Sequence, residues 1–200
     1  MTDTMWTIVE CFGVATGLIY LYLEFLQKRA MWIISIINAT TYIFVYAYAK
    51  LYADMAFYVY TVAISCYGLF LWRKSLSGKE RTTESIEYCN VTRRQVLQLT
   101  SATLVLFVVI SAMLRHFTDS PVPYLDALTT ALSIIASWMT AHRLLQHWIV
   151  WAAVNTISIP LYVMREISLT ALLFAVYAVA SLLGYLWWKR KGINIASGKD

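Results

Sequence analysis

The side chains best suited to binding chemistry form an aromatic and amide stripe in the apolar run 148–164. They recur at offsets of 0, 3, 7, 10 and 14, which is one face of an α-helix: Trp148, Trp151, Asn155, Ser158 and Tyr162. Asn155 falls near the middle of the run, where an unpaired amide is costly in lipid. The stripe predicts either a bound polar ligand or hydrogen bonds to neighbouring helices. Trp148 begins the run and fits an interfacial belt residue equally well.

A second stripe echoes the first in the apolar run 31–49. Its members lie at offsets of 0, 3, 6, 10 and 14: Trp32, Ser35, Asn38, Tyr42 and Tyr46. In the run 55–72, Tyr58 shares a helix face with Ser65 and Trp72. Two amides with several aromatic rings predict a site for a flat, polar ring, which the aromatic faces would stack and whose positive charge they could hold.

The sequence lacks the residues that catalysis, phosphate binding or metal binding would require. It contains no glycine-rich phosphate loop, no cysteine and histidine cluster with metal-ligand spacing, and no pairing of a nucleophile with a base. We therefore expect neither an enzyme, nor a cofactor, nor a metal site.

The elements that must position these stripes are membrane helices. The chain is 60% hydrophobic and 14% charged, whereas soluble domains carry about a quarter charged residues. Seven apolar runs approach the roughly 20 residues that a helix needs to span the hydrocarbon. We place them at 6–23, 31–49, 55–72, 96–114, 125–141, 148–164 and 169–188. The sequence predicts an all-α integral membrane protein that contacts the lipid bilayer.

The chain also repeats itself at an offset of 116 residues. Residues 31–74 align with residues 147–190 without a gap, and among the identities are Gly68 with Gly184 and Trp72 with Trp188. The fourth run has no counterpart, so both copies have the same orientation and the plan is 3+1+3. We expect four parts: a first repeat (1–74), a linker (75–95), a connecting helix (96–114) and a second repeat (115–200). Duplicated membrane units are typical of transporters, with the substrate near mid-membrane between the copies.

The basic residues predict an orientation and not a nucleic-acid surface. With seven spans, thirteen of the sixteen lysines and arginines fall on one side of the membrane. The positive-inside rule then places the N-terminus outside and the C-terminus in the cytoplasm. The polar stretch 75–92 is expected to be a cytoplasmic tether.

Several motifs together resemble the Pnu-type bacterial vitamin transporters, over nearly the whole chain. They are the run Lys-Leu-Tyr-Ala-Asp at 50–54, Tyr-Gly-x-x-x-Trp at 67–72, Trp-x-x-Trp-x-x-x-Asn at 148–155, and the 3+1+3 plan. The resemblance implies a SWEET-like fold, a homotrimer, and facilitated diffusion of an unphosphorylated vitamin across the bacterial inner membrane. A cytoplasmic kinase then traps the vitamin.

The resemblance also implies a site and a substrate. It assigns substrate contacts to Trp148, Trp151, Asn155 and Asn38, and nicotinamide riboside is the leading substrate. Tyr58 stands where many relatives have glutamine, which leaves thiamine or riboflavin as alternatives. A non-transporting receptor or assembly protein is a further alternative, which the repeat and the stripes disfavour. The candidate substrate-binding set is Trp32, Asn38, Tyr42, Tyr58, Trp148, Trp151, Asn155 and Ser158.

Overall fold

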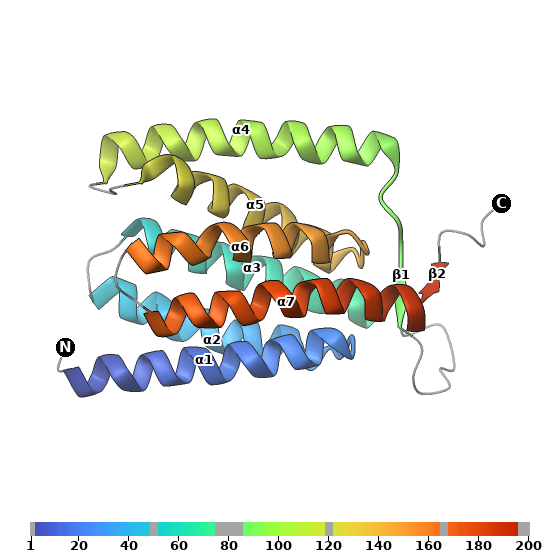
Figure 1. The fold of residues 1–200 in the computed structure, drawn as a ribbon, viewed down its shortest axis with the longest axis horizontal. Helices are drawn as coiled ribbons and strands as arrows, with labels where there is room; N and C mark the ends of the chain where they lie inside the picture. The colour runs from blue at the N-terminus through green and yellow to red at the C-terminus, as the bar shows by residue number, and fades with distance from the viewer. Residues whose placement is uncertain (1–2, 49–51, 75–85, 119–121, 165–167, 196–200) are drawn as a thin grey trace. The chain divides into compact units, whose positions relative to one another are not determined.

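The chain folds into helices, as the apolar runs predict. A computed structural model describes residues 3–48, 52–74, 86–118, 122–164 and 168–195 (Figure 1). These ranges contain seven helices and two short strands: α1 (Asp3–Phe25), α2 (Ala30–Tyr48), α3 (Tyr52–Lys74), β1 (Glu87–Tyr88), α4 (Arg93–Phe117), α5 (Pro123–Ala141), α6 (His147–Met164), α7 (Ser168–Lys191) and β2 (Ile193–Asn194). The all-helical prediction is confirmed.

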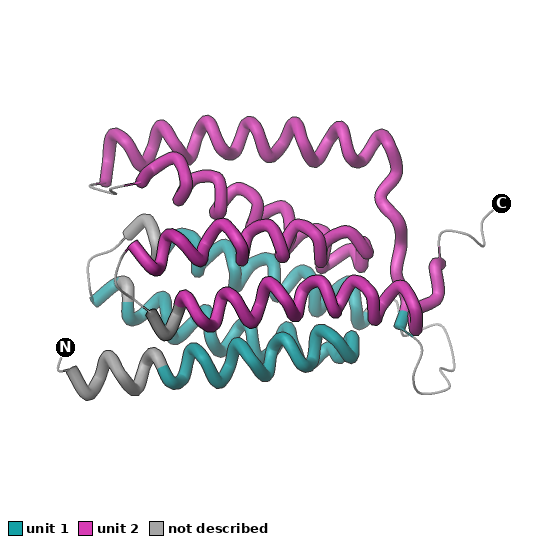
Figure 2. Tube along the Cα trace, viewed as in Figure 1, with its two compact units in different colours: residues 1–86 teal, residues 87–200 magenta. Residues whose placement is uncertain are grey.

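Two compact units divide the chain, residues 1–86 and residues 87–200 (Figure 2). In unit 1, α1 packs on α2 and α2 packs on α3. In unit 2, α4 packs on α5, α5 on α6 and α6 on α7. Within each unit, each helix therefore packs against its neighbour in the sequence, and α4 belongs to the unit of the helices that follow it.

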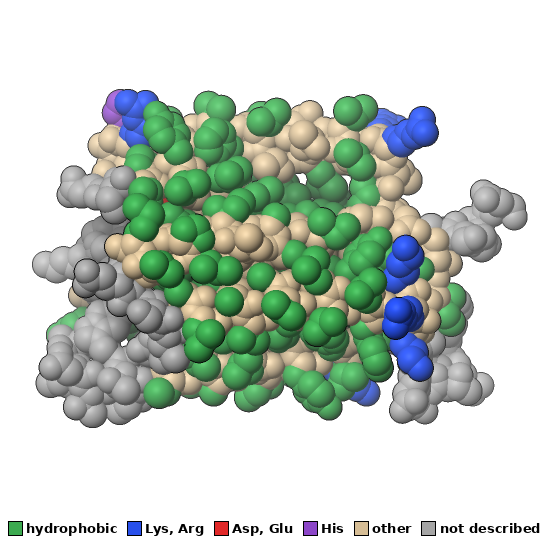
Figure 3. All heavy atoms as spheres, viewed as in Figure 1, with side chains coloured by type: hydrophobic (Ala, Val, Ile, Leu, Met, Phe, Trp, Pro, Cys, Tyr) green, Lys and Arg blue, Asp and Glu red, His purple; other side chains and the backbone are tan. Residues whose placement is uncertain are grey.

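Several helices have the length and composition of membrane spans. Within the described residues, four are long and apolar enough to cross a membrane: Met55–Arg73, Arg93–Phe117, His147–Met164 and Ala171–Lys191. Two shorter apolar segments, Cys11–Phe25 and Ala30–Val45, lie in α1 and α2. Apolar side chains cover the visible faces of α4 and α7 (Figure 3), and Leu97 and Leu172 are 71% and 63% exposed. Such exposed apolar faces suit contact with lipid.

The start of α4 is set by a capping box. The Thr92 hydroxyl accepts a hydrogen bond from the Gln95 backbone N–H at 3.3 Å, and the Gln95 side chain accepts one from the Thr92 backbone N–H at 2.9 Å. This exchange satisfies two of the backbone donors that a helix start leaves free. The helix consequently begins at Arg93, three residues before the apolar run that predicted it.

The turns that follow α1 and α5 have the same construction, at the 116-residue offset. Gln27 and Arg143 adopt left-handed backbone conformations, with φ angles of 51° and 55°. Two backbone hydrogen bonds close each turn. In unit 1 they run from Gln27 N to Glu24 O at 2.9 Å and from Lys28 N to Leu23 O at 2.8 Å. In unit 2 the equivalent bonds run from Arg143 N to Thr140 O and from Leu144 N to Met139 O, both at 3.0 Å. Both turns are Schellman motifs. The structural match thus begins before residue 31, where the sequence match starts.

The segment that precedes α4 is fastened to the rest of unit 2. Strand β1 pairs in parallel with β2, with Glu87 opposite Ile193 and Tyr88 opposite Asn194. The next residue, Cys89, exchanges backbone hydrogen bonds with the α5–α6 turn, and Glu87 forms a 3.1 Å ion pair with Arg143. The tether predicted at 75–92 is therefore a packed segment from residue 87 onward. Residues 75–85 lie outside the described ranges.

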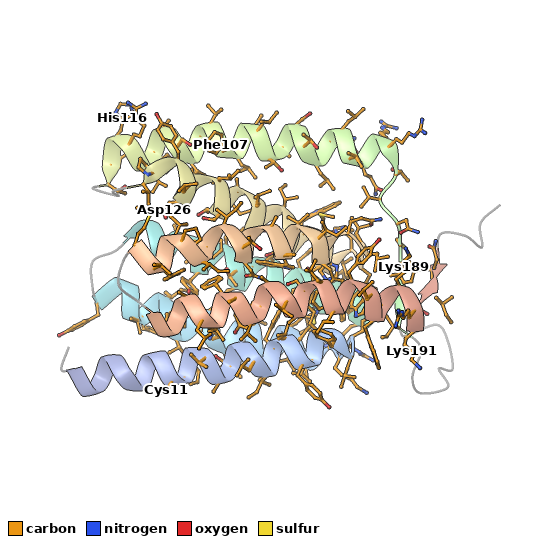
Figure 4. The ribbon with its side chains drawn as sticks, in the orientation of Figure 1. Cys11, Phe107, His116, Asp126, Lys189 and Lys191 are labelled. Atoms are coloured by element: carbon orange, nitrogen blue, oxygen red, sulfur yellow. The ribbon has the colours of Figure 1, made fainter. Side chains whose placement is uncertain are left out.

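Most of the described basic side chains of unit 2 lie at one end, with Arg115 at the other. Lys189 and Lys191 lie at the end of α7, whereas His116 and Asp126 lie at the opposite end of the unit (Figure 4). The first two residues of α4, Arg93 and Arg94, are at the lysine end. Unit 2 by itself therefore has the charge asymmetry that the positive-inside rule uses.

Candidate functional site

The first tryptophan of each stripe packs into an aromatic pair in its own unit. In unit 1, the rings of Trp32 and Trp72 meet edge to face, with centroids 5.5 Å apart and planes at 88°. In unit 2, Trp148 and Trp188 meet in the same way, at 5.6 Å and 84°. Trp32 and Trp148 are 2% and 1% exposed. The two pairs occupy equivalent positions of the repeat and are core contacts of their units.

A glycine makes room for each of these indoles. A Cβ atom added to Gly68 would lie 2.5 Å from the nearest Trp32 ring carbon, and one added to Gly184 would lie 2.6 Å from the Trp148 ring. Side-chain carbons do not approach so closely, so each ring lies directly on the backbone of the facing helix. The identity of the two glycines in the sequence repeat follows from this contact.

Asn38 lies beside α1 in unit 1. Its side-chain nitrogen is 2.6 Å from the Thr16 hydroxyl, to which it donates a hydrogen bond. Thr16 is buried, and its hydroxyl lies 2.7 Å from the carbonyl oxygen of Phe12, one helical turn earlier. Asn38 is thus tied to a neighbouring helix by its NH₂ group.

Asn155 lies beside α7 in unit 2. Its side-chain nitrogen donates a hydrogen bond of 3.3 Å to the Ser181 hydroxyl. Ser181 is 2% exposed and its hydroxyl donates to the carbonyl oxygen of Tyr177 at 2.7 Å. Asn155 itself is 6% exposed, so the amide is held in the interior of the unit.

The other two candidates on α6 also have partners within unit 2. The indole N–H of the half-buried Trp151 donates to the Thr140 hydroxyl on α5 at 3.3 Å. The buried Ser158 hydroxyl donates to the backbone oxygen of Val154 at 2.9 Å. Trp151 is therefore oriented by α5, whereas the proton of Ser158 is bound within its own helix.

Tyr42 and Tyr58 are brought together in unit 1. Their rings stack with centroids 5.0 Å apart and planes at 20°. The Tyr42 hydroxyl lies against the backbone of Gly13 on α1, where a Cβ atom would clash with it. Unit 2 has a similar stack between Tyr162 and Phe174, at 4.8 Å and 16°. Phe174 is the repeat equivalent of Tyr58.

The sequence did not single out the residues that orient the candidates. Thr16 and Ser181 hold the two amides, and Gly13 admits Tyr42. The match of Ser65 with Ser181 in the repeat was a signal for one of them, whereas Thr16 gave none. Among the described residues, no three histidine, cysteine or acidic side chains gather as metal ligands.

A family model decides the class of protein. The model for the nicotinamide mononucleotide transporter family matches residues 7–190. The chain belongs to this transporter family. The family's name describes transport and not catalysis, and the predicted resemblance to vitamin transporters is confirmed. The chain is therefore a multi-pass membrane transporter and not a receptor, an assembly protein or an enzyme.

Individual transporters of known name agree with the family. The chain is 28% identical to the nicotinamide riboside transporter PnuC of Neisseria mucosa over 183 residues, which cover 88% of this chain and 69% of the relative. It is 20% identical to PnuC of Escherichia coli K12, over 93% of this chain and 86% of the relative. A crystal structure of the vitamin B3 transporter PnuC matches with a TM-score of 0.75 at 25% identity, over 92% of this chain and 81% of that one.

Proposed function

We propose that this transporter carries nicotinamide riboside across the bacterial inner membrane by facilitated diffusion. The relatives named above carry this substrate in their names. The observation that carries the proposal is made in each unit by itself: an amide that a neighbouring helix orients, in the middle of an apolar helix, and a stacked aromatic pair. A cationic pyridinium ring with a carboxamide and a ribose needs aromatic faces and polar partners of this kind.

The positions of the basic residues favour the riboside over the mononucleotide of the family's description. Each described lysine or arginine lies in a loop or within two residues of a helix end. A phosphate dianion at mid-membrane needs a cation beside it, because its transfer out of water is otherwise prohibitive. The unphosphorylated vitamin is therefore the better match.

We assign different roles to the eight candidate residues. Asn38 and Asn155 meet polar groups of the vitamin, while Trp151, Tyr42 and Tyr58 offer ring faces to it. The remaining three candidates pack behind these groups, each within its own unit: Trp32, Trp148 and Ser158. Their burial and their contacts with backbone support this division.

The architecture that we propose is the 3+1+3 SWEET-like plan with two parallel repeats, joined by α4. It is supported by features that recur at the 116-residue offset: the two Schellman turns, the two tryptophan pairs, and the serines Ser65 and Ser181 on α3 and α7. In this plan residues 1–74 and 115–200 are the repeats, residues 75–95 the linker, and 96–114 the connecting helix.

We further propose that the N-terminus lies outside and the C-terminus in the cytoplasm, that the protein is a homotrimer, and that a cytoplasmic kinase traps the product. The basic end of unit 2 supports the orientation. The trimer and the kinase rest on the resemblance to Pnu-type transporters. Mass photometry of the protein in detergent tests the trimer.

Thiamine is the second candidate substrate, because Tyr58 stacks on Tyr42 where many relatives have a glutamine. A phenol offers a ring face and one hydroxyl, and thiamine is also a cationic aromatic. Binding of the purified protein to nicotinamide riboside, thiamine, riboflavin and nicotinamide mononucleotide, measured by calorimetry, tests the choice. We expect the riboside to bind most tightly. Tightest binding of another vitamin would identify that vitamin as the substrate. Binding of none of the four would contradict the proposed function.

A further inference from the structure

We propose that Thr16 and Ser181 are positioning residues that fix the polarity of the two site amides. They hold Asn38 and Asn155 so that each presents its carbonyl oxygen, and not its NH₂ group, to the vitamin. The inference rests on the proposed function, because it concerns contacts with the transported substrate. The inference adds a direction for each hydrogen bond between the amides and the vitamin: the vitamin donates and the protein accepts.

The first step is a count of protons at Thr16. A hydroxyl has one proton and two acceptor lone pairs. The Thr16 proton goes to its own helix, since the hydroxyl oxygen lies 2.7 Å from the Phe12 carbonyl oxygen, which can only accept. Asn38 therefore meets a lone pair, at 2.6 Å, and only its NH₂ group can donate to a lone pair. In the opposite orientation two acceptor oxygens would face each other at this distance.

The same count holds at Ser181 in unit 2. Its proton goes to the Tyr177 carbonyl oxygen at 2.7 Å, and the Asn155 side chain lies 3.3 Å from the remaining lone pairs. The NH₂ group of Asn155 must therefore point at Ser181. A hydroxyl that donates its proton to the carbonyl oxygen four residues earlier in its helix can only accept a second hydrogen bond. It therefore fixes which end of the neighbouring amide faces it.

As a consequence, the side-chain oxygen of each amide is available to accept a hydrogen bond. Among the described residues, neither the Asn38 nor the Asn155 side-chain oxygen accepts a hydrogen bond. An amide oxygen at membrane depth is costly without a donor. Nicotinamide riboside has donors in its carboxamide and its ribose hydroxyls, and the negative end of a carbonyl dipole also suits its cationic ring. The two oxygens therefore match the donors of the vitamin.

The two units reach this arrangement by different routes. Ser65, the repeat equivalent of Ser181, is bound to Ser35 at 2.8 Å and orients no amide. Unit 1 instead uses Thr16 on α1, whereas unit 2 uses Ser181 on α7. The shared amide polarity is therefore not a by-product of the duplicated sequence.

The test measures preference for donor groups and not affinity alone. The probes are nicotinamide riboside and two analogues of equal charge. In 3-acetylpyridine riboside a methyl group replaces the carboxamide NH₂, and nicotinamide 2′,3′-dideoxyriboside lacks two hydroxyls. The variants are Thr16→Val and Ser181→Ala, which remove the acceptor that turns each amide. Thr16→Ser, which keeps a hydroxyl, and Ser65→Ala, which makes the same change at the equivalent repeat position, are the controls.

We expect the native protein to bind the riboside at least about tenfold more tightly than one or both analogues, because a site built for a donor rejects a ligand without it. Thr16→Val or Ser181→Ala should lower that preference to about threefold or less, since an amide that can rotate can present either end. Both controls should keep the native preference. Thermal melting in detergent establishes that each variant is folded.

Three results would overturn the inference. One is a native protein that binds the riboside without preferring it to either analogue. The second is an unchanged preference in folded Thr16→Val and Ser181→Ala. The third is an equal loss of preference in the two controls, which would show a general loosening of the helices. Absence of riboside binding by the native protein would be a different failure, that of the proposed function itself.

Discussion

The two units share their apolar scaffold and differ in their polar contacts. Both have the Schellman turn and an edge-to-face tryptophan pair with a glycine under one indole. Their amides, however, are one residue out of register and use different partner helices, with Thr16 on α1 and Ser181 on α7. Packing thus follows the duplicated sequence, whereas the groups that we assign to substrate contact have diverged.

The segment before α4 is a second distinctive feature, because the ion pair between Glu87 and Arg143 holds it to the α5–α6 turn. We expect Arg143→Met to destabilise the protein by about 3–5 kcal/mol, because it removes an ion pair whose side chains are only 7% (Arg143) and 14% (Glu87) exposed. Leu172→Ala, at a side chain that is 63% exposed, is the control and should cost under about 1 kcal/mol. Chemical denaturation in detergent measures both. Equal losses would show that the ion pair contributes no more to stability than an exposed apolar side chain.

The two amides should matter equally for binding although their surroundings differ. Asn38→Leu and Asn155→Leu should each weaken riboside affinity by about 1–3 kcal/mol, because a donor of the vitamin loses its acceptor. Calorimetry on the purified variants gives the change in Kd. A loss confined to one variant would restrict the site to one unit. Unchanged affinity in both would remove the amides from the site.

The shared scaffold predicts equal effects in both units. Gly68→Ala and Gly184→Ala should each lower stability by about 1–3 kcal/mol, because the new methyl group overlaps the Trp32 or the Trp148 ring. Leu183→Ala is the control, since that side chain is 54% exposed. Thermal melting compares the three variants. A large difference between the two glycine variants would contradict the structural equivalence of the repeats.

Tyr58 gives the smallest expected effect and concerns substrate choice. Tyr58→Gln removes its stack on Tyr42 and introduces an amide that pairs with a carboxamide by two hydrogen bonds. We expect the affinity for nicotinamide riboside relative to thiamine to rise by a few-fold, roughly 1 kcal/mol. Competition binding with both vitamins measures the ratio. An unchanged ratio would place Tyr58 in helix packing alone.

The sequence predicted the class and the helices, because apolar run lengths reflect membrane packing directly, whereas the 3+1+3 plan stays a prediction. The substrate contacts of Trp32 and Trp148 stay predictions, since spacing defines a helix face but not what that face meets. Their edge-to-face pairs with Trp72 and Trp188 appear only when the helices are assembled.

The hydroxyls that orient the amides could not be predicted from the sequence, for a related reason. The role of Thr16 depends on a proton shared with Phe12 and on its distance to Asn38, and neither leaves a pattern in the sequence. The packed residues after 86 were also missed, because a polar composition is common to tethers and to segments held by backbone hydrogen bonds.

Uptake by the purified protein in sealed proteoliposomes tests the central claim most directly. Labelled nicotinamide riboside should enter until the inner and outer concentrations are equal, at a rate that an uncoupler leaves unchanged. Nicotinamide mononucleotide should enter no faster than into empty liposomes, because the described helices carry no cation at mid-membrane. Accumulation above the outer concentration that an uncoupler abolishes, or uptake of the mononucleotide in preference to the riboside, would contradict the account.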